Sequence, residues 1–256
     1  MTIGLPAVPD MPDFTKRFDG SEMMDDADVP AELLEKALHE LPALNRYLGG
    51  YRATRRVLDA MLRSGPLSAL RILDVGTGIG DYPRELVRWG FRHGVDVSVV
   101  GVDISEAAVA AAREASRSWR PEESARVSFA VADARDLPYP SDDFSVVTSA
   151  LFFHHLSDRE AAGVLHQMSR IARLGVIVND IHRSRIAYHG IRALTASFGF
   201  SEMVRHDGPI SVLRAFSRED LERIGRMADI GDFSVRWSPA FRWILTNLRG
   251  PSSTTS

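Results

Sequence analysis

Five short apolar runs alternate with helical patterns through the middle of this 256-residue sequence, and no other feature constrains the fold as strongly. The runs are residues 70–75, 97–102, 127–131, 144–149 and 174–178. Each run is continuously apolar, which is typical of strands that are buried on both faces. Two of the intervening helices begin at clear capping signals, Ser105 and the S-x-x-E box at 157–160. The pattern predicts a parallel sheet with helices on both faces.

The segment before this core predicts an arm followed by helices. Residues 1–29 are rich in proline and aspartate, and we expect an extended arm that either lies on the body or is disordered. Residues 30–63 show helical spacing of apolar residues. We expect two amphipathic helices there, broken near Pro42 and again at Gly49-Gly50.

The segment after the core predicts an insertion and a reversed sheet edge. Residues 183–214 are long for a connection and contain an apolar helix at 186–198, so we expect an insertion over the active edge. Residues 217–227 predict a capped helix, and residues 233–237 and 241–248 predict a terminal hairpin. The fold class is therefore α/β, a doubly wound seven-stranded sheet with an antiparallel terminal hairpin, N-terminal helices and a helical lid insertion.

These patterns divide the chain into five parts. They are an N-terminal arm and helical cap at 1–66, a ligand-binding core at 67–182, the lid insertion at 183–216, the last helix and terminal hairpin at 217–250, and a disordered tail at 251–256.

Composition excludes several classes of function. The formal net charge is −3, which argues against a protein that mainly neutralises nucleic-acid phosphates. There is no cysteine, so thiol nucleophiles, thiolate metal sites and disulfides are excluded, and the location we expect is the cytoplasm. The N-terminus lacks the pattern of a signal peptide, and the longest uncharged apolar stretch, residues 144–157, is too short to span a membrane.

A glycine cluster ends the first apolar run. Gly76, Gly78 and Gly80 stand in RILDVGTGIGDYP, after a strand and before a helix, where glycine allows a tight turn and close approach of a ligand to the backbone. The spacing is G-x-G-x-G with Asp81 next, whereas a dinucleotide site requires G-x-G-x-x-G/A. It is not a phosphate-binding P-loop either, because no Gly-Lys-Ser/Thr follows.

Three acidic residues accompany the glycines at the ends of successive strands. Asp74 lies within the end of the first strand, where a buried carboxylate needs a partner. Asp103 ends the second strand, at the spacing expected of a carboxylate that holds ribose hydroxyls. Asp133 follows the third strand, where a carboxylate can accept from an adenine amino group. Since parallel strands end at one edge, these side chains point into one crevice, the place where doubly wound sheets bind ligands.

The segments D-V-G-T-G-I-G-D, V-D-I-S, A-D-A-R-D-L-P-Y-P and SALFFHHL together resemble the class I S-adenosylmethionine (SAM)-dependent methyltransferases over residues 68–182. Within that superfamily the chain is most similar to the ubiquinone/menaquinone methyltransferase branch. The outer segments LNRYLGGYR and NDIHRSRIAYHGI show a weaker likeness to bacterial methyltransferases associated with type III polyketide synthases. The resemblance implies a Rossmann-like core, SAM as cofactor and a bacterial enzyme of secondary metabolism.

The resemblance also implies which residues contact the cofactor. Glycines of the loop would line the methionine part, Asp74 would meet its ammonium group, Asp103 would hold the ribose, and Asp133 would flank the adenine. The full set is Asp74, Gly76, Thr77, Gly78, Gly80, Asp103, Ile104, Asp133, Ala134, Ser149 and Leu151, with Ser149 to Leu151 closing the sulfonium side.

Histidines are the candidates for a catalytic base. A phenol has a pKa near 10 by analogy with tyrosine, so a base is useful, and without cysteine only histidines and carboxylates can supply it. We rank His155 first, then His206, whose neighbour Asp207 can orient its ring, then His182. No metal site is predicted, because HHLSD lacks H-x-x-x-H and no third ligand is evident.

Apolar side chains of the insertion and the N-terminal helices predict a hydrophobic roof over the acceptor. They are Ile186, Tyr188, Leu194, Phe198 and Phe200, with Leu44 and Tyr47, although the same residues could simply pack the insertion onto the body. We therefore expect methyl transfer to a small hydrophobic phenol or enol, by O-methylation. The alternatives are C-methylation of a quinone precursor and a non-catalytic SAM-binding partner subunit. No nucleic-acid partner is expected, and the sequence leaves open whether the chain forms a homodimer.

Overall fold

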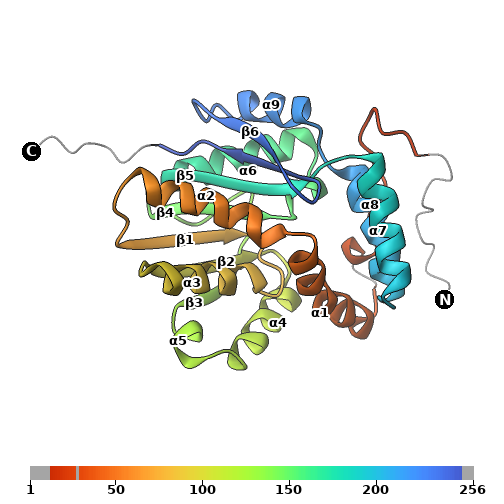
Figure 1. Cartoon of the computed structure of the whole chain (residues 1–256), viewed down its shortest axis with the longest axis horizontal. Coiled ribbons are helices and arrows are strands. Elements are labelled where there is room, and N and C mark those ends of the chain that lie inside the picture. Colours follow the sequence, from red (N-terminus) through yellow and green to blue (C-terminus); the bar gives the residue numbers. More distant parts are fainter. Residues whose placement is uncertain (1–11, 27–28, 250–256) are drawn as a thin grey trace, which may run out of the picture.

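The computed structural model describes residues 12–26 and 29–249, and within them a seven-stranded sheet forms the centre of the molecule (Figure 1). The strand order is β3-β2-β1-β4-β5-β7-β6. The strands are β1 (Ala69–Val75), β2 (Asp96–Asp103), β3 (Val127–Val131), β4 (Phe144–Ala150), β5 (Ala172–Ile181), β6 (Ser234–Ser238) and β7 (Arg242–Thr246). Strands β1 to β5 are parallel, and β7 is antiparallel to both β5 and β6. The predicted α/β fold class with its terminal hairpin is confirmed.

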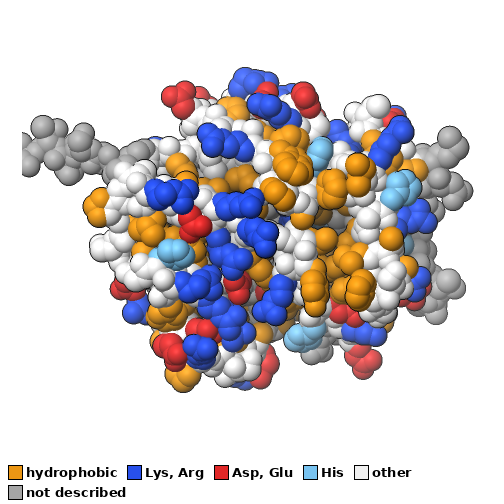
Figure 2. Space-filling model, in the orientation of Figure 1, with side chains coloured by type: hydrophobic (Ala, Val, Ile, Leu, Met, Phe, Trp, Pro, Cys, Tyr) orange, Lys and Arg blue, Asp and Glu red, His pale blue; other side chains and the backbone are white. Residues whose placement is uncertain are grey.

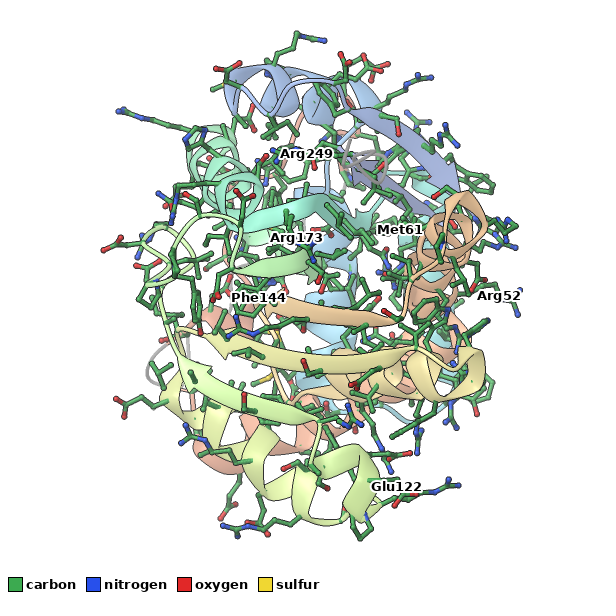
Figure 3. All side chains as sticks on the ribbon, turned by 90° about the vertical axis from the view of Figure 1, so that its left-hand side faces the viewer. Arg52, Met61, Glu122, Phe144, Arg173 and Arg249 are labelled. Carbon is green, nitrogen blue, oxygen red and sulfur yellow. The ribbon has the colours of Figure 1, made fainter. Side chains whose placement is uncertain are left out.

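Helices cover both faces of the sheet because the strands are apolar on both sides. On one face α2 (Gly50–Ser64) and α3 (Asp81–His93) pack on the strands, and on the other α6 (Asp158–Ile171) and α9 (Arg218–Met227) do so. Figure 3 shows Met61 and Phe144, which belong to these two apolar clusters, on opposite sides of the sheet. Two further helices, α4 (Glu106–Arg117) and α5 (Pro121–Ser124), pack beside β3.

The helix caps form where the sequence predicts them. Ser105 accepts a hydrogen bond from the backbone of Ala108 at the start of α4, and Ser157 with Glu160 forms a capping box at the start of α6. Helix α9 begins at a third such box, made by Ser217 and Asp220. These local contacts satisfy backbone N–H groups that a helix start would otherwise leave unpaired.

A separate apolar cluster gathers at the carboxyl end of the strands, on the right in Figure 1. It joins α1 (Ala31–Tyr47), α7 (Arg185–Ser197), α8 (Glu202–Arg214) and the short helix η1 (Met23–Asp25). Residues 12–26 of the arm therefore lie on the body. Residues 1–11 and 27–28 of the predicted arm, and the whole predicted tail at 251–256, fall outside the described residues.

The expected helix break at Pro42 is wrong, because α1 continues through this residue to Tyr47. Packing explains the difference. Leu41 and Leu44, on either side of the proline, belong to the apolar cluster shared with α7 and α8, and tertiary contacts of this kind override a local helix-breaking preference. The second expected break is confirmed, since Gly49 adopts a left-handed conformation with φ of 67° between α1 and α2.

The strand order reverses between β1 and β4, which places a crevice at their carboxyl ends. Chain leaving β1 forms the glycine loop, and chain leaving β4 forms the short helix η2 (Phe153–His155). The candidate site is built from these two segments.

Candidate functional site

The glycine loop after β1 uses its three glycines in different ways. All three have positive φ, at 72° for Gly76, 52° for Gly78 and 78° for Gly80. A Cβ on Gly76 would lie 2.5 Å from the ring of Phe152, and one on Gly80 would lie 2.5 Å from that of Phe129. A Cβ on Gly78 would meet nothing within 4 Å. Gly76 and Gly80 therefore allow the loop to pack, whereas Gly78 leaves its backbone open to a ligand.

Two buried carboxylates lie beneath this loop. Asp74, only 2% exposed, accepts a hydrogen bond of 2.8 Å from the hydroxyl of Thr148. Burial raises the pKa of Asp74 to about 7, although the Thr148 hydrogen bond opposes the shift. Asp81 accepts hydrogen bonds from the Tyr51 hydroxyl at 2.6 Å and the Asn45 amide at 2.9 Å, and burial raises its pKa as well. Two desolvated carboxylates side by side favour a cationic ligand.

Asp103 and Asp133 occupy the neighbouring strand ends, as the sequence predicts. Asp103 accepts from the backbone N–H groups of Gly78 and Ser105, each at 3.0 Å, and so joins the glycine loop to the start of α4. Asp133 is held by the guanidinium of Arg135 at 2.7 and 3.0 Å, and this hydrogen bonding lowers its pKa. Hydrogen bonds thus fix both carboxylates in place.

These residues line one cavity of about 660 Å³, which we call the cofactor cavity. It contains most of the predicted cofactor residues, namely Asp74, Gly76, Thr77, Gly78, Asp103, Ile104, Asp133, Ala134 and Leu151. Two predicted residues do not line it. Gly80 packs against Phe129, and Ser149 is 1% exposed with its hydroxyl donating to the Val75 carbonyl oxygen.

A second cavity, of about 280 Å³, adjoins the first, and we call it the acceptor cavity. Apolar side chains from α1, α7, α8 and the β6–β7 turn make most of its wall, among them Leu41, Leu44, Leu48, Ile191, Leu194, Val204 and Phe241. Its polar residues include Glu22, Asn45, His154, His155, Asp207 and Arg242. The two cavities share Met24, Leu41, Asn45, Leu151 and His155, so they meet at these residues.

The predicted hydrophobic roof is only partly in place. Leu44 and Leu194 line the acceptor cavity, whereas Tyr188 is 1% exposed and packs within the cluster of α7 and α8. Ile186, Phe198 and Tyr47 are exposed by 70%, 73% and 77%, respectively, so they do not form a roof. Helical spacing predicted an apolar surface but could not show which side of it faces the cavity.

Leu151 marks the junction of the cavities with an unusual backbone. Its φ is 56°, a left-handed conformation that is uncommon for a side chain of this size. The backbone N–H donates to the Asn179 carbonyl oxygen at 3.0 Å and fixes the turn after β4. Strain of this kind persists only where surrounding structure imposes it, and it is found at functional sites.

Of the three predicted base candidates, only His155 lines the cavities. Its Nδ1 lies 3.0 Å from an Asp25 oxygen, and 22% of its side chain is exposed. Burial acts to lower the pKa of His155, but the negative charges of Glu22 and Asp25 outweigh it, so the pKa is raised. His155 thus stands, with acidic neighbours, where the two cavities meet.

The other two candidates stand outside both cavities. His206 lies 2.8 Å from Asp207 as the sequence suggests, but Asp207 also accepts from the backbone N–H groups of Met23 and Met24 and so anchors the arm. His182 packs edge-on against Trp243, and burial lowers its pKa. The structure therefore brings together His155 and the cofactor residues, and leaves His206 and His182 apart from them.

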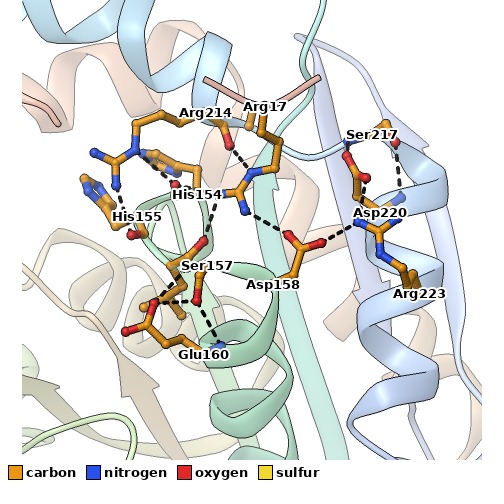
Figure 4. A network of polar contacts seen from close by, with 12 residues as sticks. Arg17, His154, His155, Ser157, Asp158, Glu160, Arg214, Ser217, Asp220 and Arg223 are labelled. Atoms are coloured by element: carbon orange, nitrogen blue, oxygen red, sulfur yellow. Dashed lines mark hydrogen bonds and ion pairs between the residues drawn. The ribbon is translucent and has the colours of Figure 1, made fainter. Parts of the chain in front are cut away.

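Arginines fix the turn that carries His154 and His155 (Figure 4). Arg17, from the arm, donates to the carbonyl oxygens of His154 and Leu156 and to the carboxylate of Asp158. Arg214, from α8, donates to the carbonyl oxygens of His154 and His155. Two segments far apart in the sequence, the arm and α8, thus hold η2 in one position.

Several residues that line the cavities were not predicted from the sequence. Glu22, Asn45, Asp81 and Met24 all line a cavity, and three of them come from the arm or α1. Asp81 carried a usable signal, because it is an acidic residue at the start of the helix after the glycine loop. The arm residues carried none, since only folding brings them to the carboxyl ends of the strands.

A third hollow, of about 580 Å³, is rich in arginine, with Arg46, Arg52, Arg55, Arg88, Arg92 and Arg120 in its wall. Figure 2 shows basic side chains gathered over α2 and α3, on this side of the molecule. Acidic residues neutralise part of it, because Glu85 pairs with Arg55 and Arg88, and Glu123 pairs with Arg88. Within the described residues no helix is long and apolar enough to cross a membrane.

Comparison with known proteins agrees with this geometry. Residues 72–175 match the model of a family described as a methyltransferase domain. The chain is 37% identical over 124 residues to the 27-O-demethylrifamycin SV methyltransferase of Amycolatopsis mediterranei, covering 48% of this chain and 42% of that protein. It is 30% identical over 172 residues to the ubiquinone/menaquinone biosynthesis C-methyltransferase of Geobacter sulfurreducens, covering 63% and 64%. The chain thus spans about half the length of these relatives.

A solved structure shows the same fold. The magnesium protoporphyrin IX methyltransferase of Synechocystis, with S-adenosylhomocysteine (SAH) bound, aligns with a TM-score of 0.53 at 20% identity, covering 78% of this chain and 84% of that one. Together with the glycine loop, the acidic strand ends and the sheet order, the match over residues 72–175 and these relatives support a class I SAM-dependent methyltransferase core with SAM as its cofactor, and the solved structure shows the fold.

Proposed function

We propose that this chain transfers the methyl group of SAM to an oxygen atom of a small hydrophobic phenol or enol. The observation that carries the proposal is the pair of cavities meeting at Leu151 and His155. One is rich in carboxylates and the other is mostly apolar. A cationic cofactor and an apolar acceptor would then meet at one point.

Residues of the cofactor cavity match the parts of SAM in turn. Asp103 would accept from the ribose hydroxyls, and Ile104 with Ala134 would pack against the adenine. The open backbone at Gly78 would allow the methionine part to approach, and Asp74 with Asp81 would attract its ammonium group. When bound, SAM supplies an electrophilic methyl group on a positively charged sulfur.

The acceptor cavity would align the acceptor with the methyl group, exclude water and activate the acceptor hydroxyl. Holding two reactants in line supplies on the order of 7–11 kcal/mol of a barrier. Apolar walls favour a reaction in which a negative oxygen and a positive sulfur become neutral, because that charge is lost in the transition state. We assign activation of the acceptor hydroxyl to His155, because it lines both cavities and His206 and His182 line neither.

The first test is cofactor binding by the Asp103→Ala variant. Removing a charged hydrogen-bonding partner should weaken SAH binding by about 1.5–3 kcal/mol, measured by isothermal titration calorimetry. Asp232→Ala, which removes an exposed aspartate that lines neither cavity, serves as the control and should bind as the natural protein does. Absence of SAH binding by the natural protein at high micromolar ligand would overturn the proposal.

The second candidate function is C-methylation of a quinone precursor. It is favoured by the likeness to the Geobacter C-methyltransferase, whereas the Amycolatopsis relative is named for a change at an oxygen. Incubation with ¹³C-methyl SAM and a panel of phenols and quinols, followed by NMR, separates a methoxy carbon from a ring methyl. No turnover of any acceptor, despite tight SAH binding, would favour a non-catalytic partner subunit.

A further inference from the structure

Two histidines and a glutamate converge beside the acceptor cavity. Glu22, His154 and His155 each present a ligand atom within 4.8 Å of those of the other two, and all three line the cavity. Glu22 is 2% exposed and His154 is 3% exposed. Such a group of buried imidazole and carboxylate side chains is the donor set preferred by zinc and related divalent ions.

Glu22 has a carboxylate oxygen without a hydrogen-bond partner among the described residues. Its Oε1 is buried and makes no hydrogen bond within these residues, and it lies 3.7 Å from Nε2 of His154 and 4.0 Å from Nε of Arg214. Two ligands about 2.1 Å from a tetrahedral ion are about 3.4 Å apart, so this separation is close to that of a shared ion but too long for a hydrogen bond. A buried carboxylate oxygen without a hydrogen bond is costly, and a bound cation would lower that cost.

The ring of His154 is already oriented as a metal ligand's ring would be. Its Nδ1 lies 2.7 Å from Asp180 Oδ1, and the other Asp180 oxygen accepts from the His154 backbone N–H at 3.0 Å. Asp180 thereby fixes the tautomer and turns Nε2 toward Glu22. A metal-binding histidine usually donates its other ring N–H to a carboxylate in this way, which fixes the orientation of the ring.

The side chains around the cluster carry more negative than positive charge, which favours a bound cation. Glu22, Asp25 and Asp180 surround the two histidines, and the nearest arginine is Arg214. Its Nε lies 4.0 Å from Glu22, beyond hydrogen-bond distance, while its hydrogen bonds go to Asp25 and to backbone carbonyl oxygens of η2. Arg214 therefore partly offsets the negative charge without occupying the position between Glu22 and His154.

We propose that Glu22, His154 and His155 bind a divalent transition-metal ion such as Zn²⁺, with an open position toward the acceptor cavity. The spacing of HHLSD does not reveal this site, because its third ligand comes from the arm. An acceptor hydroxyl bound at the open position would have a lowered pKa and would lose its proton to solvent before the transfer. His155 would then activate the hydroxyl through the ion that it holds, and this last role rests on the proposed function.

Ion binding can be tested without turnover. The full chain, treated with a chelator and dialysed, is titrated with Co²⁺ while its visible absorption is followed, and Zn²⁺ is then added to displace it. We expect one Co²⁺ per chain and loss of binding in Glu22→Gln and His155→Gln. His189→Gln, which changes an exposed histidine of α7 outside the cluster, should bind Co²⁺ normally. Asp180→Asn should bind about 10–100-fold more weakly.

SAH calorimetry on each variant keeps this result separate from the proposed function. Unchanged SAH affinity in Glu22→Gln shows that the variant is folded, so its loss of Co²⁺ binding supports the site. No Co²⁺ binding by the natural protein, or equal binding by Glu22→Gln, would overturn the inference. Co²⁺ binding without SAH binding would leave the metal site standing and remove the methyltransferase proposal.

Discussion

The buried carboxylate of Asp74 lines the cofactor cavity and titrates near neutral pH. Burial raises its pKa to about 7, so the carboxylate is protonated below that pH and ionised above it. Only the ionised form attracts an ammonium group. We therefore expect SAH affinity to rise as the pH increases from 6 to 8 and to level off above, as measured by calorimetry at constant ionic strength.

The Asp74→Asn variant provides the control for this pH dependence. It keeps the size of the side chain but cannot ionise, so SAH binding should be weaker and nearly independent of pH over the same range. A pH profile as steep as that of the natural protein would assign the titration to another group, with Asp81 the first to examine.

Gly78 and Gly80 should respond differently to alanine. At Gly80 the added Cβ meets Phe129 and the φ of 78° is strained, so Gly80→Ala should lose at least about 2 kcal/mol of unfolding free energy. Gly78→Ala meets no neighbour and should lose only about 1 kcal/mol, yet its methyl group enters the cofactor cavity and should weaken SAH binding. Urea unfolding and calorimetry measure the two effects, and equal stability losses would contradict this division.

Sequence reasoning located the residues whose roles depend on local position. Asp74, Asp103 and Asp133 follow apolar strands, and parallel strands necessarily bring such residues to one edge. Glu22 and Asn45 could not be found in that way, because their place depends on how the arm and α1 fold over the sheet. Ser149 does not line the cofactor cavity, because its side chain is buried and its hydroxyl donates to the Val75 carbonyl oxygen of the neighbouring strand.

At the scale of elements, buried strands and capped helices were predictable, and α8 was not. Its buried residues, such as Met203, Ile210 and Leu213, lie on several sides of the helix, so the sequence shows no clear apolar face. The reason is that α8 packs against α7, α1, the arm helix η1 and η2. A helix enclosed by four partners loses the periodicity that reveals an amphipathic helix.

The arm should depend on one arginine. Arg17 makes four hydrogen bonds, to Asp158, to Arg214 and to the η2 turn, and it stacks on Phe216. Arg17→Met removes these hydrogen bonds and should speed hydrogen exchange at the Met23 and Met24 amides, which Asp207 holds.

Lys16→Met is the matched control, because the neighbouring Lys16 side chain is 80% exposed. Its exchange should equal that of the natural protein, and exchange in the central strands should stay slow in both variants. Unchanged protection of Met23 and Met24 in Arg17→Met would show that contacts other than those of Arg17 secure the arm, such as those of Arg183 with Phe14 and of Arg214 with Asp25.

At the scale of the whole molecule, the shared cavity walls should make unfolding a single event. Arm, α1 and core residues all line the cofactor cavity, so SAH should stabilise them together. At 100 times its Kd, SAH adds about 2.7 kcal/mol, which corresponds to a rise in Tm of about 5–10 °C for a domain of this size. Scanning calorimetry should show one transition that moves as a whole, and a second, unshifted transition would mean that the helices of the insertion unfold separately.

The origin of the acceptor cavity bears on how proteins of this kind diverge. The family match ends at residue 175, whereas the walls of that cavity come mainly from the arm, α1, α7, α8 and the turn before β7. Mutations in these outer segments can alter the shape of the acceptor cavity while the loop and carboxylates that hold the cofactor stay intact. Under the proposed function, lineages with the same core could thus acquire new substrates through changes in these outer segments alone.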